Sequence, residues 1–289
     1  MIFSPKKMLL DASNRGYAVP AFNYYNLDVL FSVIEAAEEE EAPIIVQLYS
    51  PYYPFLYYEV IAKATIEALG RSKACSYFHL DHATDYQTIM SAIKNGFTSV
   101  MVDGSALPLN ENISLTKTVV DVARGMGTYT EAELGYINRA GEENLEEKEE
   151  IAKVDECVRL IEETGVDSLA PAVGTAHGFY KKPPKINFER IKAIRAAVNV
   201  PIVLHGGSGT PDDLILRAIE CGISKINVGT ELKHCWAESM KENLEKGEVE
   251  PRILSKHARE QVKVVAKNKI RLFGAAGKMR ELVKRAEVL

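Results

Sequence analysis

The stretch Tyr77-Phe78-His79-Leu80-Asp81-His82-Ala83-Thr84-Asp85 contains the unit on which the fold of the chain is built. An apolar run that begins at Cys75 indicates a buried strand, and this strand delivers an aspartate and a histidine side by side at its carboxyl end. A helical pattern follows, with Thr84 or Asp85 as its N-cap. Because ligands and catalytic groups of parallel α/β proteins lie at this end of the strands, we expect Asp81 and His82 to be functional. For His79 we expect a structural role.

The same unit of a strand followed by a helix recurs along the chain. Apolar runs predict eight strands, at residues 18–22, 43–49, 75–81, 99–103, 127–134, 166–173, 201–205 and 225–228. Amphipathic patterns predict helices at residues 26–40, 54–69, 85–95, 113–124, 153–164, 187–197 and 211–221. Eight such units favour a (β/α)8 TIM barrel, of the α/β class, over a doubly wound sheet.

The segment that follows the eighth unit is helical and charged. We treat residues 1–289 as a single TIM-barrel domain in which residues of about 237–289 form a helical extension that covers the barrel or a subunit interface. Two acidic runs are expected to be solvated: Glu38–Glu41, at the end of a helix, and 142–150, as a mobile loop.

Composition narrows the class of protein. The chain has 289 residues, of which 46% are hydrophobic and 26% charged, and its net charge of -5 gives no basic surface for nucleic acid. No apolar run reaches the ~18 residues of a membrane span, and the first residues lack the pattern of a signal peptide. Its four cysteines show no CxxC spacing, which favours free thiols in a reducing compartment. We therefore expect a cytoplasmic protein that binds neither membranes nor nucleic acid.

Polar residues gather where the predicted strands end. The carboxyl ends of barrel strands form one rim, which would bring together Asp81, His82, Asp103, Glu131, Glu133, His177, His205, Asn227, Gly229 and Thr230. Three neutral imidazoles with an open fourth position make a zinc site of the catalytic type. Core histidines bonded to the backbone are the alternative, but these would not be expected to cluster on one rim. The pattern therefore favours a metal site.

A glycine-rich segment suggests a second function for this rim. Residues 205–209 read His-Gly-Gly-Ser-Gly and precede a helix for which we expect Thr210 as cap and Pro211 as first residue. Backbone amides at a helix N-terminus suit an anion such as phosphate, and the loops after strands seven and eight commonly bind one. A plain tight turn is the alternative, but Asn227 and Thr230 on the next strand favour an anion site.

The motifs together resemble the class II, metal-dependent ketose-bisphosphate aldolases. They are Ala21-Phe22-Asn23, His79-Leu80-Asp81-His82, Ser99-Val100-Met101-Val102-Asp103-Gly104-Ser105, Glu131-Ala132-Glu133-Leu134-Gly135, Gly174-Thr175-Ala176-His177-Gly178, Leu204-His205-Gly206-Gly207-Ser208-Gly209 and Ile226-Asn227-Val228-Gly229-Thr230-Glu231. Gly229 and Glu231-Leu232 look closest to the tagatose-bisphosphate branch.

The resemblance implies a reaction and a role for each matching residue. It implies reversible cleavage of a ketose 1-phosphate to dihydroxyacetone phosphate and an aldehyde, through a zinc-stabilised ene-diolate. His82, His177 and His205 would hold Zn²⁺, with Glu133 and Asp103 near the metal or at an alternative metal position. Asp81 would exchange the proton of the hydroxyl at the cleaved bond. No Schiff base is then required, and we expect Lys225 to be a surface lysine at the start of its strand or at the bottom of the barrel.

The resemblance also implies a substrate site and a set of partners. Substrate would be bound by Asn23, Ser50, Gly178, Gly206, Gly207, Ser208, Asn227, Gly229 and Thr230. A monovalent cation, Na⁺ or K⁺, would lie beside the phosphate of the dihydroxyacetone phosphate half. The protein would act on a small sugar phosphate in carbohydrate metabolism such as glycolysis, as a homodimer or homotetramer.

Three departures from the family pattern fall on the aldehyde side of the substrate. The loop after Gly135 has Asn138-Arg139 where the family has two glycines, which makes Glu142, with Glu143 behind it, the candidate loop acid. After strand two, Tyr49 occupies the place of a family Ser or Thr, with Ser50 as its substitute. Near the C-terminus Lys278 stands where an arginine often reaches a neighbouring subunit's substrate, and lysine lacks the bidentate fork of arginine.

These departures leave several substrates and functions open. Fructose or tagatose 1,6-bisphosphate is the simplest substrate, and the alternatives are 6-deoxy-6-sulfofructose 1-phosphate and 6-phospho-5-dehydro-2-deoxygluconate, whose far ends Arg139 and Lys278 would bind. From other classes, a metal-dependent TIM-barrel hydrolase would need a His-x-His pair on the first strand, where Ala21-Phe22-Asn23 stands. A subunit that only binds phosphate would lack a zinc ligand or Asp81, and all four are present.

Overall fold

A closed barrel of eight parallel strands forms the centre of the molecule. The computed structural model describes residues 1–137, 151–180 and 183–286. The strands pair in sequence order and the last pairs with the first. They are β1 (Val19–Asn23), β2 (Ile44–Tyr49), β3 (Ser76–Ala83), β4 (Ser99–Val102), β5 (Tyr129–Leu134), β6 (Ser168–Pro171), β7 (Ile202–Leu204) and β8 (Ile223–Val228). The predicted TIM barrel is therefore confirmed, with each strand near its expected place.

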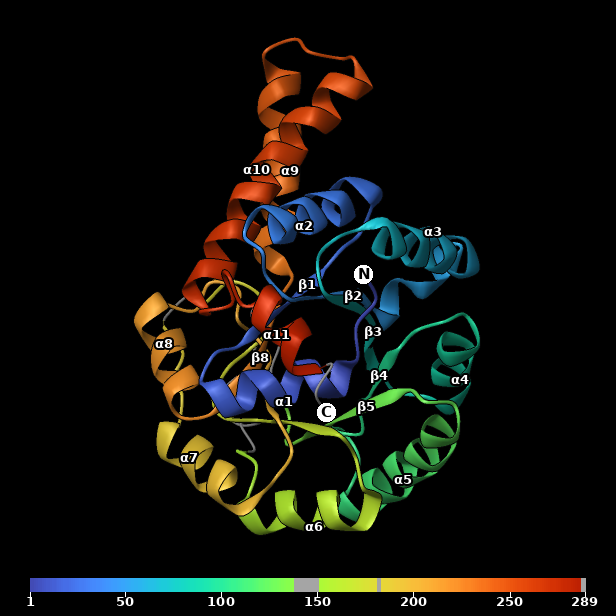
Figure 1. Cartoon of the computed structure of the whole chain (residues 1–289), viewed down its shortest axis with the longest axis vertical. Helices are drawn as coiled ribbons and strands as arrows, with labels where there is room; N and C mark the ends of the chain where they lie inside the picture. The colour runs from blue at the N-terminus through green and yellow to red at the C-terminus, as the bar shows by residue number, and fades with distance from the viewer. Residues whose placement is uncertain (138–150, 181–182, 287–289) are drawn as a thin grey trace.

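Helices surround the barrel and close one of its ends (Figure 1). The outer ring consists of α2 (Leu27–Glu39), α3 (Tyr58–Arg71), α4 (Tyr86–Lys94), α5 (Leu109–Gly125), α6 (Val154–Thr164), α7 (Phe188–Ala197) and α8 (Asp212–Glu220), with a 3-10 helix η1 (Ser50–Phe55) after β2. The C-terminal helical region comprises α9 (Thr230–Glu245), α10 (Pro251–Leu272) and α11 (Met279–Ala286). α1 (Pro5–Arg15), which the sequence patterns did not predict, lies with α11 across the amino ends of the strands.

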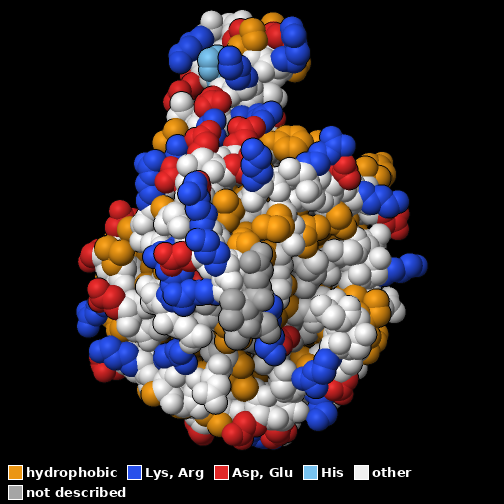
Figure 2. Space-filling view, in the orientation of Figure 1, with side chains coloured by type: hydrophobic (Ala, Val, Ile, Leu, Met, Phe, Trp, Pro, Cys, Tyr) orange, Lys and Arg blue, Asp and Glu red, His pale blue; other side chains and the backbone are white. Residues whose placement is uncertain are grey.

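Helix α9 leaves the carboxyl rim of the barrel and α10 returns beside it, forming a helical hairpin that we call the arm (Figure 1). Figure 2 shows acidic and basic side chains mixed at the root of this arm. There Lys263 and Lys267 of α10 approach Glu39 to within 3.2 and 2.8 Å, and Arg271 approaches Glu40 to within 2.6 Å. The expectation that Glu38–Glu41 is solvated holds for the exposed Glu39, but it missed the ion pairs of this run: Glu39 and Glu40 pair with α10, and Glu41 pairs with Arg280 at 2.5 Å.

Local contacts fix the junction between β3 and α4, where the functional residues were expected. Asp85 is the N-cap of α4, since its side chain accepts a hydrogen bond of 2.8 Å from the amide of Thr88. Upstream, Leu80 and Ala83 pair with Val100 and Val102, so β3 carries one extra residue opposite β4. This β-bulge re-aims the chain at the barrel rim.

Thr210 does not cap the helix for which it was predicted. Its hydroxyl donates to the carbonyl of Gly206 at 2.9 Å, and α8 begins two residues later after Pro211, without a side-chain cap. The Thr210 side chain therefore stabilises the preceding loop, residues 205–209, and is not available to cap α8. The helix still begins near its predicted position, because Asp212 and Asp213 favour a first turn.

The apolar core lies between the strands and the outer helices, whereas the barrel interior is partly polar. Alternate residues of each strand face inward, and the buried ones include Gln47, His79, Ser99, Glu131 and Lys225. The polar interior lies directly beneath the carboxyl rim. Within the described ranges, none of the helices is long and apolar enough to cross a membrane.

Candidate active site

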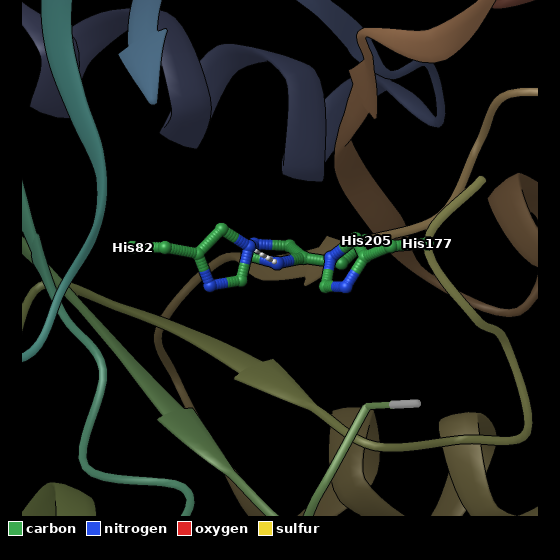
Figure 3. A group of neighbouring side chains, drawn as sticks. All are labelled: His82, His177 and His205. Carbon is green, nitrogen blue, oxygen red and sulfur yellow. Dashed lines mark hydrogen bonds between the residues drawn. The ribbon is translucent and has the colours of Figure 1, made fainter. Parts of the chain in front are cut away.

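Three histidines, from β3 and from the segments that follow β6 and β7, converge at the carboxyl rim (Figure 3). The ring centroids of His82 and His205 lie 4.6 Å apart, and those of His82 and His177 lie 4.8 Å apart. Nε2 of His82 is 3.0 Å from Nδ1 of His205. All three offer a ring nitrogen within 4.8 Å of the others, so the group could hold a metal ion.

The bulge in β3 explains how Asp81 and His82 can be neighbours in sequence and still face one pocket. Strict alternation would place them on opposite faces of the strand. His82 instead adopts a left-handed backbone, with φ of 53°, and its amide donates to the sulfur of Met101 at 3.4 Å rather than to a strand carbonyl. Such a conformation is uncommon for a residue other than glycine, and tertiary contacts must maintain it.

Carboxylates surround His82 on its other side. Nδ1 of His82 lies 2.8 Å from Asp103 and 3.6 Å from Glu133, which forms a second group that could hold a metal. Burial alone would lower the pKa of His82, but Asp81, the hydrogen bond to Asp103 and Glu133 together raise it to about 10. Burial and the neighbouring Asp103 raise the pKa of Glu133. The cluster therefore favours a positive charge beside the imidazole.

The residues present fit a bound cation. Glu133 Oε2 is buried and accepts no hydrogen bond among the described residues, yet it lies 3.3 Å from Nδ1 of His205. Imidazole nitrogens with nearby carboxylates are the donor set that zinc prefers. The hydrogen bond from His82 Nδ1 to Asp103 leaves Nε2 directed at the other two rings, as in carboxylate–histidine–metal arrangements.

Asp81 is buried and held by two amides. Nδ2 of Asn23 donates to one carboxylate oxygen at 2.8 Å, and Nδ2 of Asn227 donates to the other at 3.1 Å. Burial raises the pKa of Asp81, and the nearby His82 opposes this effect. Oδ1 of Asn227 accepts no hydrogen bond among the described residues. A carboxyl group with a raised pKa beside a metal site is suited to general acid–base work.

A polar layer lies beneath the three histidines. Nε2 of His205 is 3.1 Å from Oε1 of Glu131, whose other oxygen is 2.7 Å from Nζ of Lys225. Lys225 also lies 3.3 Å from Nε2 of His79. The expectation of a surface lysine was wrong: Lys225 is fully buried in the barrel interior. This buried lysine contacts Glu131, which in turn contacts His205, so it belongs to the layer of residues on which the three histidines rest.

Small residues and backbone from β6 to β8 form one half of the pocket. The pocket is lined there by Gly178, Gly206, Ser208, Asn227, Gly229 and Thr230, for each of which the sequence predicts a substrate contact. The hydroxyl of Ser208 accepts from the amides of Gly229 and Glu231 at 3.2 and 3.3 Å, which fixes the first turn of α9. The arrangement presents backbone and a helix N-terminus to an anion.

Gly206 permits the close approach of two loops. Its φ of 75° is left-handed, and a Cβ there would come within 2.3 Å of the carbonyl of Ala176. The hydroxyl of Tyr180 accepts from the amide of Ala176 at 2.8 Å and lies 3.0 Å from the carbonyl of Gly206. The loops after β6 and β7 are thereby tied together beside His177 and His205.

Aromatic residues form the other half of the pocket. Besides Asn23, the lining there includes Tyr25, Tyr49, Tyr52 and Lys233. Tyr52 makes edge contacts with Tyr25 and Tyr49, with ring centroids 5.4 and 5.3 Å apart, and Tyr49 packs edge-on against His82 at 5.8 Å. Nζ of Lys233 lies 5.9 Å from the centre of the Tyr25 ring.

Sequence reasoning missed Tyr25, Tyr52 and Lys233 as pocket residues, although two signals were present. Tyr25 follows the end of β1 by two residues, and strand ends were already recognised as the site. Lys233 follows Thr230 by one helical turn and therefore lies on the same face of α9. Tyr52 had no comparable signal, since its position depends on η1.

Several predicted residues do not line the pocket. Ser50 begins η1, and Gly207 supports the loop, with its amide bonded to Asn227. Lys278 lies 5.7 Å from the ring of Tyr17, close to the amino end of β1, so it cannot reach the pocket of its own chain. Arg139, Glu142 and Glu143 lie outside the described residues.

The chain is similar along its length to known aldolases. The family described as "Fructose-bisphosphate aldolase class-II" matches residues 4–278. A fructose-bisphosphate aldolase of Staphylococcus epidermidis is 38% identical over 284 residues, which cover 96% of this chain and 99% of the relative.

Solved structures share the fold. The YdjI aldolase from Escherichia coli K12 superposes with a TM-score of 0.88 at 36% identity, covering 96% of this chain and 100% of the other. A fructose-bisphosphate aldolase from Campylobacter jejuni superposes with a TM-score of 0.82 over 96% of this chain and 97% of the other, and at 21% identity it supports the fold alone.

Members of this family are generally metal-dependent, and the cluster of histidines and carboxylates supplies a candidate metal site. They are lyases that act on small sugar phosphates. The barrel, the site at its carboxyl rim and the matches over nearly the whole chain agree, and the chain belongs to the class II fructose-bisphosphate aldolase family.

Proposed function

We propose that the protein is a zinc-dependent aldolase that cleaves a ketose 1-phosphate to dihydroxyacetone phosphate and an aldehyde. The observation that carries the proposal is the convergence of His82, His177 and His205 beside the buried Asp81. The three imidazoles would hold Zn²⁺, with Asp103 and Glu133 beside it. When bound there, Zn²⁺ would act as a Lewis acid for the ketose carbonyl.

Asp81 would exchange the proton of the hydroxyl at the cleaved bond. Its two carboxylate oxygens are oriented by Asn23 and Asn227, and its raised pKa lets it hold a proton at a higher pH than an exposed aspartate. Orientation by two amides also keeps the carboxyl group directed at one place in the pocket. We assign the proton on the enolate carbon to Glu142, the loop acid suggested by the sequence.

The phosphate of the dihydroxyacetone phosphate half would bind among Gly178, Gly206, Ser208, Asn227 and Thr230. This half is closed by backbone and by the first turn of α9, where amides are available to phosphate oxygens. A monovalent cation, Na⁺ or K⁺, beside this phosphate remains part of the proposal. The small residues allow the phosphate to approach the backbone closely.

The part of the substrate that becomes the aldehyde would contact Lys233 and the tyrosines of the aromatic half, Tyr25, Tyr49 and Tyr52. This places one positive charge on the far side of the pocket, which suits the distal phosphate of fructose or tagatose 1,6-bisphosphate. A substrate with a sulfonate or a differently placed acid, as in 6-deoxy-6-sulfofructose 1-phosphate or 6-phospho-5-dehydro-2-deoxygluconate, would use the same charge.

Two further predicted residues would complete this distal end: Arg139, in the loop after β5, and Lys278. Because Lys278 lies at the opposite end of its own barrel, a neighbouring subunit would have to supply it, as expected of a homodimer or homotetramer. Sedimentation of the purified protein tests the assembly. Substrate affinity, measured for the native protein and for a Lys278→Met variant, tests the contribution of Lys278.

The main experiment combines metal analysis with parallel substrate assays. The purified protein should contain one zinc per three-histidine site, lose cleavage on chelation and regain it with zinc. Asp81→Asn should keep the zinc and lose turnover by a factor of about 10² to 10⁴. Fructose, tagatose, sulfofructose and deoxy-ketogluconate phosphates should be compared side by side. A metal-free preparation with full activity would refute the proposal.

A further inference from the structure

The polar layer beneath the metal-binding histidines contains a run of buried groups that the proposed chemistry does not use. It runs from His205 to Glu131, then to Lys225, His79 and Ser99, and each of these residues is at most 1% exposed. Successive contacts measure 3.1, 2.7, 3.3 and 2.7 Å. The five residues come from β3, β4, β5, β8 and the end of β7, so the layer crosses the whole barrel interior.

Lys225 sets the direction of the two hydrogen bonds that it makes in this layer. An ammonium group has three donors and no acceptor, whereas each other member can accept. Glu131 must therefore offer Lys225 an unprotonated oxygen, and His79 must offer it the lone pair of Nε2. It follows that the proton of His79 lies on Nδ1, from which it is donated to Ser99.

The same logic fixes the proton of His205. An ionised Glu131 can only accept, so Nε2 of His205 must carry its proton toward Glu131 Oε1. Nδ1 of His205 is then left with its lone pair, and this is the nitrogen that lies 3.0 Å from Nε2 of His82. Of the two neutral tautomers of His205, only this one can bind a metal shared with His82.

We propose that Lys225 is a positioning residue of the metal centre, which acts through Glu131 to hold His205 in the tautomer with Nδ1 free for the metal. The inference rests on the proposed zinc site. Outer carboxylates of this kind commonly change metal affinity by a factor of ~10–100 when they are removed. Here the lysine behind the carboxylate holds one of its oxygens and leaves the other to accept from His205.

The proposal makes an unusual prediction about two variants. In Glu131→Gln the amide must turn its oxygen to Lys225, because lysine cannot accept. Its NH₂ group then faces His205 Nε2 and selects the wrong tautomer, which should weaken zinc binding by a factor of ~10–100. In the double variant Glu131→Gln/Lys225→Met the amide is free to turn its oxygen to His205. The double variant should therefore bind zinc more tightly than Glu131→Gln alone.

The measurements are zinc affinity, by competition with a chromophoric chelator, and the tautomer of His205 in the metal-free protein, by long-range ¹H–¹⁵N spectra. Circular dichroism establishes that each variant is folded. Lys225→Met alone should also weaken zinc binding, because Glu131 loses the 2.7 Å contact that holds its other oxygen in place behind His205. If that variant fails to fold, the single and double variants at Glu131 decide the matter.

A matched control is Lys269→Met, which removes another largely buried ion pair between a lysine and a glutamate. Nζ of Lys269 lies 2.9 Å from Glu231, the residue is 8% exposed, and among the described residues it forms no hydrogen bond with an imidazole. The zinc affinity of the Lys269→Met variant should stay within about twofold of the native value, since no metal ligand loses a partner. Lower thermal stability with unchanged zinc affinity and an unchanged His205 tautomer in the Glu131 variants would overturn the proposal. Failure of the native protein to bind zinc would instead overturn the proposed function.

Discussion

The two halves of the pocket are built from different kinds of group. From β6 to β8 the lining consists of glycines, short polar side chains and the start of α9. Near the ends of β1 and β2 and at η1 it is mainly tyrosine rings, with Asn23 and Lys233. The barrel fixes the position of this backbone. It therefore suits a group that every substrate presents in the same place, such as the phosphate shared by all ketose 1-phosphates. Side chains can be exchanged without disturbing the fold, and under the proposed function they would face the part of the substrate that differs between aldolases.

Among variants that separate the two halves, the largest effect is expected from Gly206→Ala, in the backbone half. A Cβ would come within 2.3 Å of the carbonyl of Ala176, so the loops beside His177 and His205 must separate. We expect kcat/KM to fall by about a hundredfold for every ketose phosphate, as misplaced reacting groups commonly cause. Gly127→Ala is the control: its φ of 69° is similar, but nothing lies within 4 Å of the added Cβ. It should lower stability by ~1–2 kcal/mol and leave kcat/KM unchanged.

Ser208→Ala should have the next largest effect, again without regard to the aldehyde half. Two amides of the first turn of α9 lose their acceptor at 3.2 and 3.3 Å, so the phosphate meets a less ordered helix end. The loss of about 1–2 kcal/mol corresponds to a rise in KM of about tenfold. Ser224→Ala, at a buried serine of β8 outside the pocket, should leave KM unchanged. Unequal effects on substrates with different far ends would contradict the division of the pocket.

Lys233→Met should distinguish substrates where the first two variants do not. Removing the charge beside Tyr25 should lower kcat/KM for a bisphosphate by about tenfold, in line with a charged hydrogen bond of ~1.5–3 kcal/mol, and for fructose 1-phosphate by less than about twofold. Lys241→Met, further along the same helix and exposed, should change neither value. Equal losses for both substrates would place Lys233 in the phosphate half instead.

Tyr52→Ala should give the smallest effect. The variant removes two edge contacts, with Tyr25 and Tyr49, each worth ~0.5–1.5 kcal/mol, and widens the aromatic wall. We expect kcat/KM in the synthesis direction to change by only about two- to fivefold, with bulky aldehydes accepted better than in the native protein. A panel of aldehydes condensed with dihydroxyacetone phosphate measures this, and a uniform loss across the panel would argue against a wall that selects aldehydes.

Much of the fold and of the metal site could be predicted because both depend on local patterns. Apolar runs and helical periods locate the eight strands, and closure of the barrel then brings their ends together without further information. His82, His177 and His205 were found in this way. Asp85 as a cap was predicted from two neighbouring candidates by the same local chemistry.

The predictions that were wrong or incomplete concern residues whose role depends on partners far away in the sequence. Glu39 and Glu40 look like a solvated helix end until α10, more than 200 residues later, crosses them. Lys225 was taken for a surface lysine by residue type, although it shares its strand face with Asn227, two residues on. Alternation would have placed both in the barrel, but only the structure shows that Glu131 is there to receive the charge.

The bend at His82 limits how the site can be transplanted. An engineer who moves the Asp–His pair into another eight-stranded barrel cannot graft the two residues onto a regular strand, because one of them would face the outer helices. The insertion opposite β4 has to be copied as well, together with the sulfur of Met101 that receives the displaced amide. The smallest portable version of this chemistry is thus a pair of adjacent strands with a defect built into one of them.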